Sequence, residues 1–304
     1  MIYHDDWMDN EIPDKSINLI IADPPYFEVK GEFDFIWPSF DAYLQDVEKW
    51  AIECKRILAD NGCLFWWGNV EKIAYSQIII DRYFKLENVI IWHKPDSMQY
   101  QYYSRELARR FTTNNERILF YSNEKNVNAF SIEIKKGMQK YNLKEMDFRK
   151  LKQSQNGNPT GWCSNIILGK SIPTEEDWIL ICSLIRKGNN YKHLLQEYEE
   201  LRRSFDNIYD LSDIITQSQE STISKGYDHE TIKPLKLTKK LIQTTTRKGD
   251  MVLIPFGGSG TEVEACIDTG REYICYETKK KHYDTIKERE YKALLQPELC
   301  EITV

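Results

Sequence analysis

Residues 250–261 read Asp-Met-Val-Leu-Ile-Pro-Phe-Gly-Gly-Ser-Gly-Thr, an apolar run that leads into a glycine-rich turn. The run from Asp250 to Ile254 predicts a short strand. A helical pattern from Glu262 to Asp268 follows the turn and ends at Gly270. Glycines between a strand and a helix let a ligand approach the backbone, where the first helical turn offers free N–H groups. This stretch therefore predicts a ligand-binding α/β unit.

An acid stands where nucleotide-binding folds place one. The run from Tyr273 to Tyr276 predicts the next strand, and Glu277 ends it, 19 residues after Gly258. A carboxylate at this place accepts hydrogen bonds from ribose hydroxyls. No Gly-Lys-Ser/Thr follows the glycines, which disfavours a Walker-type phosphate site. A cofactor with adenosine but no pyrophosphate fits the pattern better than an ordinary tight turn does.

The second motif lies near the other end of the chain. The apolar run 18–22 predicts a buried strand, and Asp23-Pro24-Pro25-Tyr26 follows it directly. Two prolines stiffen the backbone, so the Asp23 carboxylate and the Pro24 carbonyl can point at one NH2 group. Both are acceptors, and an exocyclic amine supplies two donors. Tyr26 adds a flat surface on which a base can stack.

Strands and helical patterns alternate on both sides of these motifs. Apolar residues three and four apart predict a helix over 39–61, stopped by Asn61-Gly62. A helix over 234–245, with proline in its first turn, precedes the glycine-rich region. Further strands are predicted over 2–4, 63–67, 88–92 and 117–121. This alternation predicts an α/β sheet with helices on both faces.

The middle of the chain, residues 124–226, has a different character. Its periodicity is weaker, and a charged helical pattern over 191–205 is typical of a solvated surface helix. Basic residues gather in its first third at Lys135, Lys136, Lys140, Lys144, Arg149, Lys150 and Lys152. We therefore expect this segment to be an insert that folds separately.

Composition narrows the class of protein. The chain has 304 residues, 41% of them hydrophobic, and no apolar run approaches the roughly 18 residues that cross a membrane. The start shows no signal peptide, and the seven cysteines contain no CxxC pair, so we expect reduced thiols, a cytoplasmic protein and no metal site. The five histidines show no metal spacing either. The net charge of -6 does not indicate nucleic-acid binding, but phosphate contacts need only a local basic face.

Together the two motifs resemble those of DNA amino-methyltransferases. Asp23-Pro24-Pro25-Tyr26 is similar to their catalytic motif, and 249–261 is similar to their cofactor region. The order, with the catalytic motif first and the cofactor motif last, resembles the beta group of this family. The resemblance implies a Rossmann-like S-adenosylmethionine-dependent methyltransferase sheet with an inserted target-recognition domain. It divides the chain into a catalytic half (1–123), the insert (124–226) and a cofactor-binding half (227–304).

The resemblance also assigns residues. Asp23, Pro24, Pro25 and Tyr26 would be catalytic. Glu277 would hold the cofactor ribose, and Asp5 or Asp6, after the first strand, matches an acidic position on the cofactor side. The segment Trp92-His93-Lys94-Pro95 looks like a strand end near the DNA. The remaining cofactor positions are Lys233, Phe256, Gly258, Ser259, Gly260 and Thr261.

The implied reaction is methyl transfer from S-adenosylmethionine to N6 of an adenine flipped out of double-stranded DNA. Tyr26, with help from Trp37 or Phe27, would stack on the base, and no covalent enzyme intermediate is needed. Most of the acceleration would come from positioning and from aligned acceptors. The resemblance leaves open a homodimer and a cognate restriction endonuclease, and it implies no membrane partner.

One departure keeps alternatives open. The family has an acid near the cofactor where this chain has Ile254. A DNA-binding protein with a degenerate cofactor site therefore stays an alternative. So does methylation of N4 of cytosine, although Asp rather than Ser at position 23 favours adenine. RNA or a protein glutamine amide is a further substrate class, but those relatives tend to carry Asn where this chain has Asp23.

Overall fold

The computed structural model describes residues 1–29, 34–96, 111, 113–123, 128–152, 160–220 and 232–295. The chain divides into two compact units. The larger unit contains residues 1–124 and 204–304, and the smaller contains 125–203. None of the helices within the described ranges is long and apolar enough to cross a membrane.

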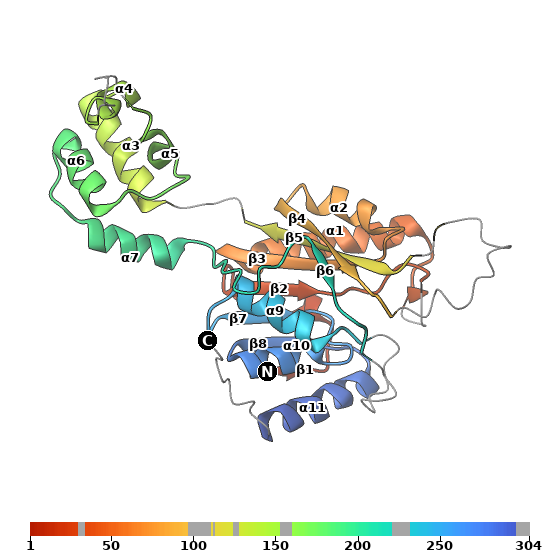
Figure 1. The fold of residues 1–304 in the computed structure, drawn as a ribbon. Helices are drawn as coiled ribbons and strands as arrows, with labels where there is room; N and C mark the ends of the chain where they lie inside the picture. The colour runs from red at the N-terminus through yellow and green to blue at the C-terminus, as the bar shows by residue number, and fades with distance from the viewer. Residues whose placement is uncertain are drawn as a thin grey trace. The chain divides into compact units, whose positions relative to one another are not determined.

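The larger unit is built on one mixed sheet of eight strands in the order β1-β8-β7-β2-β3-β5-β4-β6 (Figure 1). β5 runs antiparallel to both of its neighbours, and the other neighbouring pairs are parallel. The predicted α/β sheet is confirmed. The strands are β1 (Ile2–Tyr3), β2 (Ile17–Ala22), β3 (Leu58–Gly68), β4 (Lys85–His93), β5 (Asn115–Ser122), β6 (Ile214–Thr216), β7 (Met251–Ile254) and β8 (Glu272–Tyr276).

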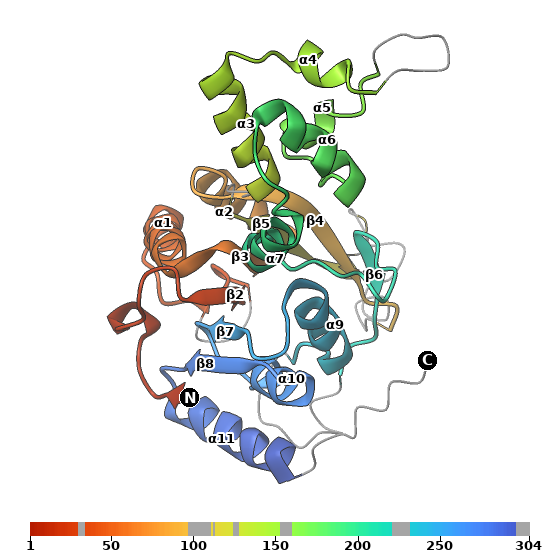
Figure 2. The ribbon, with the colours of Figure 1, turned by 90° about the vertical axis from the view of Figure 1, so that its left-hand side faces the viewer.

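Helices cover both faces of this sheet, as Figure 2 shows. α1 (Phe40–Ile57) and α2 (Ile73–Ile80) bury apolar residues in the core of one face. α9 (Leu235–Thr245) and α10 (Thr261–Thr269) do so on the other face, where α11 (Lys280–Leu295) packs against α10. A short 3-10 helix, Trp7–Asp9, follows β1.

The boundary between α1 and β3 differs from the prediction. The Ser39 hydroxyl accepts a hydrogen bond from the Ala42 N–H at 3.2 Å and caps the helix at its start. The helix then ends at Ile57, four residues before the predicted stop, because Leu58 already pairs with β2. The register shifts by the time Cys63 pairs, so residues 59–62 form an irregularity inside the strand rather than the end of the helix.

The pairing of β2 with β7 brings together two segments from the N-terminal and C-terminal parts of the chain. Leu19 is opposite Val252 and Ile20 is opposite Leu253, and the strands run in the same direction. Parallel strands end at the same edge of a sheet, so the residues that follow β2 and β7 share one edge. β8 and β1 extend this edge, since β8 pairs in parallel with β7 and β1 with β8.

The smaller unit is helical and has its own apolar core. Phe130 and Trp178 meet edge to face at 5.0 Å between ring centroids, and Phe148 is also completely buried. Its helices are α3 (Ala129–Tyr141), α4 (Glu145–Arg149), α5 (Ser164–Ile167), α6 (Glu175–Ile185) and α7 (Tyr191–Leu201). The predicted surface helix over 191–205 corresponds to α7 and ends earlier, at Leu201.

The chain returns to the sheet earlier than the predicted insert ends. The sequence predicts an insert that reaches residue 226, whereas the compact helical unit ends at Arg203. The reason is β6, which pairs in parallel with β4 and places Ile214 opposite Ile91. The predicted boundaries at 124 and 226 themselves lie outside the described residues.

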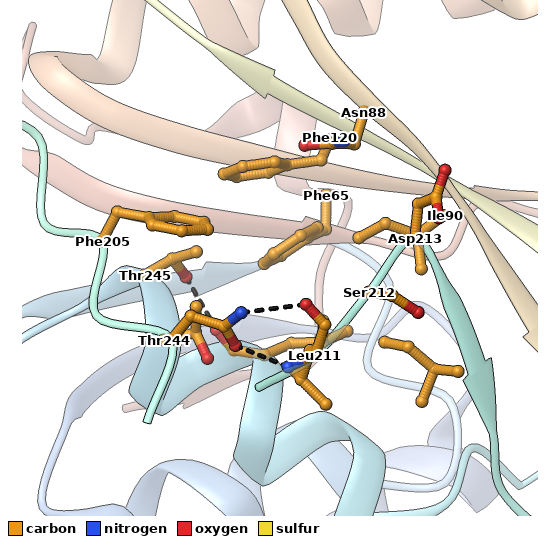
Figure 3. Close-up of a pocket in the computed structure, with 13 residues that line it drawn as sticks. Phe65, Asn88, Ile90, Phe120, Phe205, Leu211, Ser212, Asp213, Thr244 and Thr245 are labelled. Atoms are coloured by element: carbon orange, nitrogen blue, oxygen red, sulfur yellow. Dashed lines mark hydrogen bonds between the residues drawn. The ribbon is translucent and has the colours of Figure 1, made fainter. Parts of the chain in front are cut away.

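The returning segment covers a small pocket of about 80 Å³ on the sheet (Figure 3). Phe120 stacks on Phe65 at 4.8 Å and on Phe205 at 6.1 Å between ring centroids. The Asn207 side chain closes the loop above by donating to the Leu211 carbonyl and accepting from its N–H, both at 2.9 Å. The pocket lies beside the C-terminal part of α9, the opposite end of that helix from the site described below.

Candidate active site

The Asp23 carboxylate is held at both oxygens. Its Oδ1 accepts a hydrogen bond from the Tyr26 hydroxyl at 2.6 Å, and its Oδ2 lies 2.8 Å from Nζ of Lys233. Pro24 is buried, and the Tyr26 N–H donates to the buried carboxylate of Asp34. Burial and the nearby Asp23 charge raise the pKa of Tyr26 well above its usual value, so the phenol keeps its proton. The turn therefore fixes the carboxylate in one orientation.

Lys233, predicted to be a cofactor position, contacts the carboxylate of Asp23 in the other motif. Its side chain, in a residue 5% exposed, lies over the Trp67 ring at 5.1 Å and the Tyr26 ring at 5.7 Å. Burial alone would lower the pKa of Lys233, but the carboxylates of Asp23 and Glu116 raise it above its ordinary value. The side chain is therefore an ammonium that neutralises Asp23.

Glu116, at the start of β5, connects two lysines. Its Oε2 lies 3.4 Å from Nζ of Lys233, and its Oε1 pairs with Lys94, which follows β4. The Lys94 ammonium also lies 4.3 Å from the centroid of the Trp92 ring. Burial opposes ionisation of Glu116, but Lys233 and Lys94 together lower the pKa of its carboxyl. Charges thus alternate along the sheet edge in the order Asp23, Lys233, Glu116 and Lys94.

The glycine turn after β7 is tied to the end of β8. Gly258 has φ 49° and Gly260 has φ 78°, conformations that favour glycine. The Gly258 N–H donates to Oε2 of Glu277 at 2.9 Å, and the Lys279 N–H donates to Oε1 at 2.8 Å. Two backbone donors therefore orient the Glu277 carboxylate, whose further lone pairs can accept from ligand hydroxyls.

Ser259 and Thr261 fix the turn from its inner side. Nη1 of the buried Arg289 donates to the Ser259 carbonyl at 3.1 Å and to the Thr261 hydroxyl at 2.9 Å. The Thr261 hydroxyl donates in turn to the Lys233 carbonyl at 3.3 Å. Arg289 is itself paired with Glu264. Arg289 and the Thr261 hydroxyl thus hold the backbone of the turn, and contact of Ser259 or Thr261 with a cofactor stays a prediction.

Asp5 and Asp6 follow β1 at the same edge. Asp6 accepts a hydrogen bond from the Met8 N–H at 2.9 Å and so caps the short helix. Asp5 is exposed and accepts from the Asp6 N–H at 2.9 Å. Phe256 packs its ring edge to face against Trp50 at 5.0 Å, and its role is therefore at least partly structural. The cofactor contacts of these three residues stay predictions.

Glu262 is a site residue that the sequence did not single out. It lies in the first turn of α10 and is 5% exposed. Burial, followed by the Asp23 charge, raises the pKa of Glu262 to about 7. Ile254, where an acid is expected from the family resemblance, is completely buried in the core opposite Cys275. Glu262 is therefore a second acid beside the glycine turn, in addition to Glu277.

The chemistry of this edge fits a cationic adenosine cofactor. Asp23, Glu262 and Glu277 bring carboxyl groups to it, and Lys233 neutralises only part of that charge. The glycine turn and the start of α10 supply backbone N–H groups for polar ligand atoms. Within the described ranges, no cluster of three or more His, Cys, Asp or Glu residues could hold a metal. The six cysteines there are buried and form no disulfide.

Two characterised relatives resemble most of the chain. The type II methyltransferase M.HinfI of Haemophilus influenzae is 27% identical over 300 residues, which cover 91% of this chain and 64% of the relative. The DNA adenine methyltransferase YhdJ of Escherichia coli is 23% identical over 279 residues, which cover 90% of this chain and 75% of the relative. This chain thus spans somewhat less than two thirds of the length of M.HinfI.

Solved structures share the fold. The M1.HpyAVI-SAM complex has a TM-score of 0.55 at 19% identity and covers 95% of this chain and 98% of its own. The cytosine-N4-specific PvuII DNA methyltransferase has a TM-score of 0.55 at 14% identity. The match covers 96% of this chain and 89% of the PvuII enzyme. A family model described as DNA methylase, N6/N4 type, matches residues 17–288, which include both motifs and the insert. The resemblance inferred from the motifs is confirmed: this chain belongs to the N6/N4 DNA methylase family.

Proposed function

We propose that this protein transfers a methyl group from S-adenosylmethionine to the N6 amino group of adenine in double-stranded DNA. The observation that carries the proposal is the junction at Lys233. Its Nζ lies 2.8 Å from Asp23, and its carbonyl accepts a hydrogen bond from Thr261 at the end of the glycine turn. The proposed catalytic and cofactor motifs are therefore neighbours. One relative supports adenine over the cytosine-N4 alternative, since the DNA adenine methyltransferase YhdJ matches 90% of this chain.

The chain's own groups account for activation of the amine. A flipped adenine, which costs a few kcal/mol to unstack, presents two N6 hydrogens. Asp23 and the Pro24 carbonyl accept them, and this localises the lone pair on the nitrogen. Lys233 and the Tyr26 hydroxyl hold the Asp23 carboxylate in place, and its remaining lone pairs can still accept hydrogen bonds. Asp23 is also the nearest carboxylate to receive the proton that the nitrogen loses.

The cofactor supplies an electrophilic methyl group on a sulfonium. Glu277 would accept the ribose hydroxyls, because two backbone N–H groups already orient its carboxylate toward the glycine turn. The backbone of 258–261 would lie against the rest of the cofactor. Asp5 would contribute from the end of β1, while Asp6 caps the helix beside it.

The helical unit 125–203 is proposed to recognise the target sequence. Four members of its basic cluster pair with acids of the same unit, namely Lys136, Arg149, Lys150 and Lys152. Lys135, Lys140 and Lys144 are exposed, and no carboxylate partner is seen for them among the described residues. Such lysines suit contacts to phosphates. A homodimer, a cognate restriction endonuclease and a cytoplasmic location stay predictions of the family resemblance.

One experiment tests both the cofactor and the base. Purified protein is incubated with duplex DNA and S-adenosylmethionine, and the digested nucleosides are identified by mass spectrometry. The expected product is N6-methyladenine, which is absent with Asp23→Asn. N4-methylcytosine would favour the alternative base, and no product with DNA of varied sequence, together with no cofactor binding, would favour the degenerate site.

A further inference from the structure

Four charged residues form a row across the edge of the sheet that carries the site. Asp23, Glu116 and Lys94 each stand two positions from a residue buried in the core on the α9 side. Side chains alternate between the two faces of a strand, so these three point to that side as well. Because β5 is antiparallel to β3 and β4, its first residues lie at the edge where those strands end. Lys233, just before α9, completes the row.

Lys233 has two carboxylate partners at different distances. Its Nζ lies 2.8 Å from Oδ2 of Asp23 and 3.4 Å from Oε2 of Glu116. Among the described residues, Lys233 forms no other ion pair, and no hydrogen-bond donor competes for Oε2 of Glu116. Because Lys233 is almost completely buried, its ammonium depends on these two carboxylates in place of water.

The proposed reaction removes the charge of the nearer partner. As the amine nitrogen forms its bond to the methyl carbon, the bond from that carbon to sulfur breaks and the sulfur keeps the electron pair. The proton that the nitrogen loses passes to Asp23, so the total charge is conserved and Asp23 becomes neutral. A buried ammonium beside a neutral acid is costly unless another anion is near.

We propose that Glu116 is the second counter-ion of Lys233 and keeps the buried ammonium paired while Asp23 is protonated. This inference rests on the proposed function. Glu116 acts through Lys233 and is therefore a positioning residue rather than a catalytic one. Its other oxygen pairs with Lys94, and this compensates the partial burial of the Glu116 carboxylate.

A double-mutant cycle in urea tests the counter-ion without any cofactor. Asp23→Asn imitates the neutral form of Asp23 and leaves Glu116 as the remaining carboxylate on Lys233. Glu116→Gln should therefore raise the unfolding equilibrium constant at least about tenfold more in the Asp23→Asn background than in the wild type. The cost of leaving Lys94 without its partner occurs in both backgrounds and cancels. Additive effects of the two substitutions would overturn the inference.

Asp268→Asn is the matched control for this cycle. The Asp268 side chain is 7% exposed, lies near the end of α10 and pairs with Lys239 at 2.6 Å, outside the row. Its replacement should have the same effect on unfolding in the wild type and in Asp23→Asn. Coupling as large as that of Glu116 would mean that loss of any paired acid weakens the Asp23→Asn protein, and the inference would be wrong.

Methyl transfer measures the role of Glu116 in the reaction. With labelled S-adenosylmethionine and duplex DNA of varied sequence, Glu116→Gln should lower the single-turnover rate at least about tenfold. Its Kd for S-adenosylmethionine, measured by calorimetry, should stay within about twofold of the wild-type value, because Asp23 is still ionised at that stage. Adding Lys94→Gln removes the unpaired lysine and should restore stability but not the rate. A restored rate would assign the effect to Lys94 and overturn the inference.

The outcomes distinguish this inference from the proposed function. If the wild type methylates DNA but Glu116→Gln has a normal rate, the role of Glu116 is wrong and the methyltransferase proposal stands. If the wild type neither binds S-adenosylmethionine nor methylates DNA, the proposed function fails, and this inference fails with it. Should Glu116→Gln alone not fold, the rate and Kd of its combination with Lys94→Gln decide the question.

Discussion

The buried Lys233 and the partly exposed Asp23 form an ion pair of 2.8 Å although 210 residues separate them in the chain. The pair joins the start of α9 to the end of β2. It therefore fixes the position of the Asp23 motif relative to the segment that leads to the glycine turn. Replacing only one member of such a pair is destabilising, because the charge of the other member then has no partner.

Replacing Asp23 should therefore affect both activity and stability. Asp23→Asn, which keeps the shape, should lower kcat by at least about 100-fold, because one aligned acceptor and its charge are lost. Asp23→Ala should in addition destabilise the fold by about 3 kcal/mol, since Lys233 loses its nearest carboxylate. Methyl transfer and urea unfolding measure the two effects. Near-normal turnover in the folded Asn variant would refute the catalytic assignment.

Lys233→Met should also lower both the activity and the stability of the protein. It leaves Asp23 and Glu116 facing each other without the cation between them. We expect a loss of about 3 kcal/mol in unfolding free energy. Lys233→Arg retains the charge and should recover part of the stability. If Met and Arg variants unfold at the same urea concentration, the charge of Lys233 does not support the fold.

The stability of the protein should depend on pH through Glu262. The folded-state pKa of this carboxyl is raised from 4.5 to about 7, so the folded protein binds the proton more tightly than the unfolded chain. Its contribution is thus largest at low pH and is lost as pH rises from about 4.5 to about 7, by up to about 3 kcal/mol. Glu262→Gln should flatten this decline in urea unfolding measured at pH 5, 6, 7 and 8. A wild type and variant with parallel profiles would contradict the raised pKa.

The glycine turn allows a matched comparison. Gly260 and Gly249 have φ of 78° and 82°, so alanine at either site should cost about 1–2 kcal/mol of stability. At Gly260 a Cβ would also lie 3.2 Å from Cα of Ile286, whereas nothing lies within 4 Å at Gly249. Gly260→Ala should therefore weaken S-adenosylmethionine binding, and Gly249→Ala should not. Calorimetry on both variants checks this, and equal affinities would remove the turn from the cofactor site.

The salt dependence of DNA binding tests whether the helical unit 125–203 contacts DNA phosphates. Replacing both Lys135 and Lys140 by Glu should weaken DNA binding and reduce the slope of log K against log salt by about 0.9 for each phosphate that the variant no longer neutralises. Lys49→Glu, in the larger unit, is the control, because its side chain pairs with Asp46 on the surface of α1. An unchanged slope in the double variant would place the DNA-binding surface elsewhere.

Much of the sheet could be predicted from the sequence, because β2, β7 and β8 are apolar runs that end at a proline or an acid. The resemblance of both motifs to one family implied a common active site, but the pairing of β2 with β7 that brings Asp23 and the glycine turn to one edge is seen only in the structure. The end of α1 was harder, since the helical pattern of apolar residues continues to Leu58, which belongs to β3.

Glu116 and Glu262 could not be found in the same way. Glu116 reaches Lys233 only because β5 runs antiparallel beside β3, a pairing that no local pattern reports. Glu262 stands in the first turn of a helix, where acids are common because they favour the helix dipole. Its burial beside Asp23 is a property of the assembled sheet.

The pairing of β2 with β7 has a consequence for synthesis of the protein. Leu19 leaves the ribosome 233 residues before its partner Val252, a delay of about 10–50 s at usual elongation rates. During that time one side of β2 has no neighbouring strand, and the nascent chain depends on β3 or on a chaperone to shield it. A polypeptide released before Val252 would lack the glycine turn, so the proposed site can form only after this part of the chain has been synthesised.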